Sequence, residues 1–146
     1  MTHEGLAVRV DDLTVERGGR EVLHGLTFDL GRGVLTGLLG PSGGGKTTLM
    51  RAIVGVQARV RGSCEVLGLP AGSPPLRARI GYLTQEPAVY HDLTVRENLR
   101  YFAAVLRAPV RDVDRVLEAV DLTPEANRLV RDLSGGQESR VSLACA

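Results

Sequence analysis

Apolar and polar residues alternate near the start of the chain, which is typical of β-strands with one buried face. Residues 7–13 alternate in this way, and residues 22–30 form a second run that ends before Gly31. Residues 17–20, Arg-Gly-Gly-Arg, have the composition of a tight turn and predict a hairpin between these runs. A shorter run at 63–67 continues the strand pattern. The pattern therefore predicts an antiparallel β-sheet in the first part of the chain.

Two continuous apolar runs predict buried strands of a different kind. Residues 34–39 read Val-Leu-Thr-Gly-Leu-Leu, and residues 80–83 read Ile-Gly-Tyr-Leu. Short continuous apolar runs are typical of strands covered on both faces. Residues 47–54 have helical spacing with one apolar side. The order strand, glycine-rich loop, helix is therefore predicted around residue 40.

The hydrophobic period changes to that of helices beyond Pro87. Thr94 and Glu97 have the T-x-x-E spacing of a capping box, and apolar residues follow at helical intervals. Residues 112–120 predict a second amphipathic helix. Thr123 followed by proline predicts the start of a short third helix, with the threonine as its N-cap. This helical block is predicted to be a subdomain inserted into the strand-rich core.

Composition excludes several functional classes. The 146 residues suffice for one domain, and 43% of them are hydrophobic. With 18 basic and 17 acidic residues, the net charge of +1 does not favour nucleic acid as a partner. The two cysteines suggest neither a disulfide framework nor a metal site. We expect no signal peptide, because the first residues include acids and form no apolar segment. No run of about 20 apolar residues is present, so we expect a membrane role to require a partner.

Residues 40–48, Gly-Pro-Ser-Gly-Gly-Gly-Lys-Thr-Thr, fit the phosphate-loop pattern G-x-x-x-x-G-K-[ST]. Glycines let successive backbone N–H groups point inward around an anion, and the following helix adds its positive end. Lys46 provides a mobile charge for the β- and γ-phosphates, and the Thr47 hydroxyl suits Mg²⁺. The candidate nucleotide-binding residues are therefore Gly40, Pro41, Ser42, Gly43, Gly44, Gly45, Lys46, Thr47 and Thr48. The alternative is a glycine-rich turn that binds nothing.

A second motif, Leu-Ser-Gly-Gly-Gln at residues 133–137, has the S-x-x-Q spacing of a capping box. Two adjacent glycines at a helix start leave backbone N–H groups bare, which suits a phosphate. The alternative is an ordinary helix cap with two flexible glycines.

The phosphate loop (residues 40–48) followed by the signature motif (residues 133–137) resembles the ATP-binding-cassette (ABC) ATPases, the nucleotide-binding subunits of ABC transporters. Residues 81–85 resemble the Q-loop of that family, and residues 93–99 resemble the start of its helical subdomain, most closely in the exporter branch that includes drug-resistance pumps.

The fold that this resemblance implies is α/β. It has a P-loop NTPase (RecA-like) core, an antiparallel β flank and an inserted α-helical subdomain, and it is incomplete at the C-terminus. The implied parts are the core and β flank at 1–87, the helical subdomain at 88–137 and the start of the return to the core at 138–146.

The resemblance also implies roles for individual residues. Lys46 and Gln85 would be catalytic, and Thr47 and Gln85 would contact Mg²⁺ beside bound ATP. The residues expected to contact ATP held by a second subunit are Ser134, Gly135, Gly136 and Gln137. The implied partners are a second ABC ATPase subunit, in a homo- or heterodimer, and a separate transmembrane permease. The implied location is cytoplasmic, peripheral on the inner face of the cell membrane.

Two departures from the family pattern stand out. Arg17 lies where the family usually has an aromatic residue against adenine, so it either stacks through its guanidinium plane or is a solvated turn residue. The sequence stops at Ala146, before the family's Walker B strand and catalytic glutamate, and every histidine precedes the signature motif, which leaves no switch histidine. We therefore expect a fragment of a longer protein, inactive as an ATPase by itself.

The expected function of the parent protein is hydrolysis of MgATP to power transport across a membrane. Two alternatives remain open at this point. One is a soluble ABC ATPase of DNA repair or translation, and the other is a non-catalytic fragment that only binds a partner.

Overall fold

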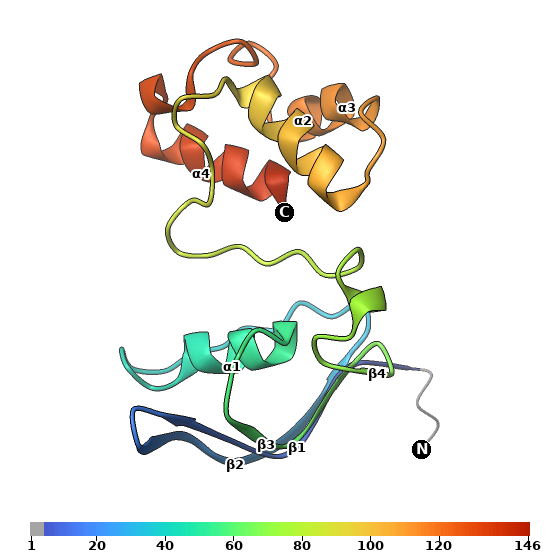
Figure 1. Cartoon of the computed structure of the whole chain (residues 1–146), viewed down its shortest axis with the longest axis vertical. Coiled ribbons are helices and arrows are strands. Elements are labelled where there is room, and N and C mark those ends of the chain that lie inside the picture. The colour runs from blue at the N-terminus through green and yellow to red at the C-terminus, as the bar shows by residue number, and fades with distance from the viewer. Residues whose placement is uncertain (1–4) are drawn as a thin grey trace. The chain divides into compact units, whose positions relative to one another are not determined.

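The chain divides into two units between Ile80 and Gly81 in the computed structural model, which describes residues 5–146 (Figure 1). Each unit has its own cluster of buried apolar side chains. The domain ranges 1–87, 88–137 and 138–146 stay a prediction.

The first unit contains the predicted antiparallel sheet. Its strands are β1 (Leu6–Arg17), β2 (Arg20–Gly31), β3 (Val60–Val66) and β4 (Leu69–Pro70), in the order β2-β1-β3-β4 with every neighbouring pair antiparallel. At the predicted hairpin Arg17 pairs with Arg20, and the two glycines between them have φ angles of 57° and 77°. Positive φ at both central positions matches the twist of the flanking strands.

One face of this sheet is covered by α1 (Lys46–Val54), as Figure 1 shows. Leu49 and Ala52 of α1 are buried against the alternating residues of β1. The helix ends at Gly55, whose φ of 82° and N–H bonds to the Arg51 and Ala52 carbonyls form a glycine C-cap. A single 3₁₀ turn, η2 (Pro74–Leu76), follows β4 and adds Leu76 to the core. The predicted helix is therefore present, and its position is fixed by burial on the sheet.

The strands predicted at 34–39 and 80–83 are wrong: neither segment has strand structure. Leu35 and Leu39 are almost fully exposed. A strand satisfies its N–H and C=O groups only through a neighbour, and within residues 5–146 neither segment pairs with another strand. Apolar composition alone therefore does not produce a strand at these two places.

The second unit contains α2 (Val95–Leu106), α3 (Asp112–Ala119), the 3₁₀ turn η3 (Val130–Asp132) and α4 (Gly135–Cys145). The capping box predicted for Thr94 and Glu97 is confirmed: the Thr94 hydroxyl accepts from the Glu97 N–H, and the Glu97 carboxylate accepts from the Thr94 N–H. These hydrogen bonds hold the pKa of Glu97 below its ordinary value of 4.5.

The short helix predicted at Thr123 is wrong, because this segment forms successive turns instead. Its carbonyl groups serve the neighbouring helix: Ala126 O accepts from Arg96 N–H, and Arg128 O accepts from Val95 N–H. These two N–H groups lie in the first turn of α2, where no intrahelical acceptor exists. The carbonyl groups of Ala126 and Arg128 therefore accept hydrogen bonds from α2, whereas in a helix at this position they would accept from N–H groups of that helix.

The core of the second unit joins α2, α3 and α4. Its buried apolar residues are Val95, Leu99, Val113, Leu117, Leu122, Ala126, Val130, Val141 and Cys145. Burial raises the pKa of the Cys145 thiol to about 12. Asn98 is also fully buried; its side chain accepts from Tyr90 N–H at 2.8 Å and donates to the carbonyls of Tyr90 and Thr94 at 2.9 and 3.0 Å. The Asn98 amide therefore joins the turn at Tyr90 to the start of α2 by hydrogen bonds.

Candidate nucleotide-binding site

The phosphate loop leads directly into α1, as the sequence predicts. Gly45 is the N-cap of α1, and its carbonyl accepts the first helical bond from Leu49 N–H at 2.9 Å. No side chain among residues 5–146 caps the start of this helix. Within the loop, Gly44 N–H donates to Pro41 O at 3.1 Å and closes a turn. A helix start without a side-chain cap presents its N–H groups and its positive end to an anion.

Gly45 has both a conformational and a steric reason to be glycine. Its φ is 84°, and an added Cβ would lie 2.7 Å from Leu23 Cδ2 and 3.2 Å from the Val22 carbonyl oxygen. The start of β2 thus presses directly against the loop. The motif identifies this glycine, whereas the contact with β2 is a tertiary feature that the sequence analysis missed.

Lys46 lies over the loop. Its Nζ donates to the carbonyls of Gly40 at 2.8 Å and Pro41 at 2.6 Å. An ammonium group has three donors, so these two bonds leave one for another acceptor. Lys46 is also the single lysine of the sequence. The arrangement places one mobile positive charge at the mouth of the loop.

A pocket of about 350 Å³ opens beside this charge, lined by residues 43–48 together with Arg17 and Val22. Figure 1 shows why these parts meet: the β1–β2 turn and the loop before α1 lie at the same end of the first unit. Thr47 is exposed here, and its hydroxyl is a hard oxygen donor that fits Mg²⁺. Thr48 is buried beneath the loop. The phosphate loop and Arg17, far apart in sequence, thus line one pocket.

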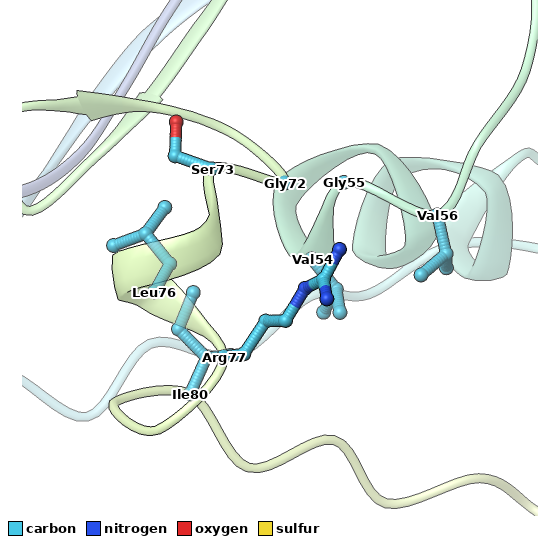
Figure 2. A pocket seen from close by; sticks show the side chains of 8 residues that line it. All are labelled: Val54, Gly55, Val56, Gly72, Ser73, Leu76, Arg77 and Ile80. Carbon is cyan, nitrogen blue, oxygen red and sulfur yellow. The ribbon is translucent and has the colours of Figure 1, made fainter.

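A second pocket of the first unit, of about 330 Å³, lies at the opposite end of α1 (Figure 2). Gly55 and Gly72 meet there so closely that a Cβ on Gly55 would lie 2.1 Å from Gly72 Cα. Half of its lining residues are aliphatic, and Arg77 is its charged member. The C-terminal end of a helix carries negative partial charge, so this pocket does not suit a phosphate.

The signature motif starts α4 in the second unit. The capping box is confirmed: Ser134 Oγ accepts from Gln137 N–H, and Gln137 Oε1 accepts from Ser134 N–H. Gln137 Nε2 donates to Glu125 Oε1 at 3.1 Å. The amide of Gln137 is thus occupied inside the chain. Gly135 and Gly136 are exposed, and apart from chain neighbours and the backbone of α4 no atom of residues 5–146 lies within 4 Å of a Cβ added to either one.

Contacts that hold this helix start come from residues that the sequence analysis did not single out. Glu125 binds Gln137, and His91 Nε2 lies 2.8 Å from Glu138 Oε1. Arg140 donates to the carbonyls of Val120 and Asp121, both at 3.0 Å. No spacing rule links these pairs, because they join separate segments of the unit.

Gln85 is exposed in the segment that precedes α2. It belongs to the second unit, whereas Lys46 and Thr47 belong to the first. Among residues 5–146 no cluster of three or more His, Cys, Asp or Glu side chains is placed to hold a metal ion.

Comparison with protein families identifies the chain. The family model described as ABC transporter matches residues 23–146. The chain belongs to this family. The match includes both the phosphate loop and the signature motif, and it confirms the resemblance noted from the sequence.

Curated relatives and solved structures agree with this assignment. The chain is 40% identical to the cytochrome c biogenesis ATP-binding export protein CcmA of Roseobacter denitrificans, over 95% of this chain and 62% of that protein. It is 36% identical to the hemin import ATP-binding protein HmuV of Rhizobium meliloti, over 94% of this chain and 55% of that protein. An ATP-binding subunit of an ABC transporter superposes with a TM-score of 0.82 at 27% identity, covering 96% of this chain and 61% of that one.

Two consequences follow from these matches. The α/β fold class is confirmed, since the structural likeness extends over nearly the whole chain. The chain spans less than two thirds of the length of these relatives. Export and import proteins both match, so the placement in the exporter branch stays a prediction.

Proposed function

We propose that the chain binds MgATP in the phosphate loop, as the nucleotide-binding part of an ABC transporter ATPase. The observation that carries this proposal is the uncapped start of α1 behind Gly45 with the Lys46 ammonium over it. The backbone N–H groups there and the helix end attract the phosphates. Lys46 exchanges its loop carbonyls for β- and γ-phosphate oxygens, and the Thr47 hydroxyl holds Mg²⁺.

In the whole protein, a second subunit completes the binding site around the ATP. Its Gly135 and Gly136 offer bare N–H groups to the γ-phosphate, next to Ser134. Gln137 supports this contact from behind, because its amide is held by Ser134 and Glu125. The γ-phosphate then bridges two subunits, and its hydrolysis releases them. Gln85 is proposed to contact Mg²⁺ or the attacking water.

Transport is proposed to follow from the joining and release of the two subunits, which a separate transmembrane permease senses. The names of the export and import relatives support this role. No helix among residues 5–146 is both long and apolar enough to cross a bilayer. We place the working complex at the inner face of the cell membrane, where ATP is available. For the 146 residues alone we propose binding without turnover, since the pocket as described is lined by no carboxylate.

The single lysine allows a direct test of binding. We expect MgATP to protect Lys46 against acylation by an amine-reactive ester, measured by peptide mass spectrometry. Labelling of Lys46 in Mg²⁺ buffer without nucleotide is the control. AMP lacks the β- and γ-phosphates and should protect weakly. Unchanged Lys46 labelling at millimolar MgATP would refute the proposed function.

A further inference from the structure

The lining of the nucleotide pocket leaves few side chains for the base. Residues 43–48 supply the phosphate end, and the two lining residues from elsewhere are Arg17 and Val22. A nucleotide with its phosphates in the loop therefore meets these two side chains with its sugar and base. Val22 offers only apolar contact, so Arg17 is the polar group of this wall.

Arg17 is free to bind a ligand. Its side chain is exposed at the end of β1. The glutamates that flank the turn are engaged elsewhere: Glu16 pairs with Arg59, and Glu21 pairs with Arg61. Among residues 5–146, the Arg17 guanidinium takes part in none of the ion pairs of the hairpin. The side-chain hydrogen bonds of the hairpin also come from Arg59 and Arg61, so within residues 5–146 the Arg17 donors are available to a ligand.

The chemistry of a guanidinium distinguishes the purines. It presents donors only, in a planar fork that matches two neighbouring acceptors. Guanine offers O6 and N7 side by side, whereas adenine offers N7 beside an amino group that is itself a donor. An aromatic side chain would stack on either base without this distinction.

We propose that Arg17 reads the base edge at this site, so that the site binds MgGTP in addition to MgATP, and binds MgGTP more tightly. This inference rests on the proposed function, because it requires a nucleotide in the phosphate loop. It assigns base preference to the turn between β1 and β2 rather than to the loop itself.

The test measures Lys46 protection by nucleotides that differ only in the base. For the 146-residue chain we expect MgGTP to give half-protection at about one fifth of the MgATP concentration that does so. This fivefold preference is the lower end of the discrimination expected for an Arg–guanine pair, because Arg17 is exposed. MgITP keeps O6 and N7 and should match MgGTP. Mg-7-deaza-GTP lacks N7 and should lose most of the advantage.

Two variants at the same turn separate base reading from general charge. Arg17→Ala should bring the GTP-to-ATP ratio to one. Arg20→Ala is the matched control, since Arg20 pairs with Arg17 across the hairpin but does not line the pocket. GTP and ATP carry equal charge, so the loss of one positive charge in either variant weakens the binding of both nucleotides equally and leaves their ratio unchanged. Protection by both nucleotides without a preference for GTP, or a preference that survives Arg17→Ala, overturns this inference alone. Failure of every nucleotide to protect Lys46 overturns the proposed function as well.

Discussion

Replacing Gly45 by alanine tests how the phosphate loop is held against the sheet. Two separate costs arise from the structure. An alanine at φ 84° adopts a left-handed backbone, which costs about 1–2 kcal/mol. Its Cβ would also lie 2.7 Å from Leu23 Cδ2 and 3.2 Å from the Val22 carbonyl oxygen. Leu23 is buried in the core and Val22 O is backbone, so relief requires the loop or β2 to move, at about 1–3 kcal/mol.

Gly68 provides the matched control. Its φ is 78°, and an added Cβ would meet no atom within 4 Å. Gly68→Ala therefore carries the backbone cost without the crowding. The difference between the two variants should be about 2 kcal/mol, or about 10 °C in Tm for a unit of this size. The assay is thermal unfolding followed by circular dichroism, together with Lys46 acylation at 25 °C.

The second readout links this packing to the site. If the methyl group added by Gly45→Ala pushes the loop away from β2, the bonds from Lys46 to Gly40 and Pro41 weaken, and Lys46 should be acylated faster than in the Gly68→Ala variant. Equal melting temperatures and equal labelling rates for the two variants would show that β2 does not support the loop as described.

The remaining predictions concern the second unit. Asn98→Leu removes the hydrogen bonds to Tyr90 and Thr94 and leaves their backbone groups unpaired, so the free energy of unfolding in urea should fall by about 3 kcal/mol. Asn127→Leu, at an exposed position, is the control and should lower it by under about 0.5 kcal/mol. Similar losses for the two variants would contradict the role of Asn98. The lowered pKa of Glu97 means that the folded state binds its proton less readily than the unfolded state, so its contribution is present above pH 4.5 and is lost as the pH falls through the folded-state pKa. Glu97→Gln should flatten this part of the stability–pH curve, and the exposed Glu118→Gln should leave it unchanged.

Features that depend on neighbours in the chain could be predicted from the sequence. The two capping boxes, at Thr94 and at Ser134, join residues three apart, so their spacing is sufficient evidence. The hairpin at Arg17–Arg20 and the helix after the phosphate loop follow from turn composition and helical periodicity in the same way. The phosphate loop itself is recognisable because its chemistry requires fixed residue types at fixed intervals.

Features that depend on distant partners were decided only by the tertiary structure. The apolar segments 34–39 and 80–83 are not strands, because a strand exists only with a neighbour for its backbone groups. The turns after Thr123 replace a helix because their carbonyls serve α2. Arg17 and the phosphate loop line one pocket, and Glu125 accepts a hydrogen bond from Gln137, only because folding brings separate segments together. The sequence by itself thus determined where the phosphate-loop pattern lies and which helix follows it. The packing of β2 and of the hairpin turn decided what surrounds the loop, because those contacts join positions that no local spacing relates.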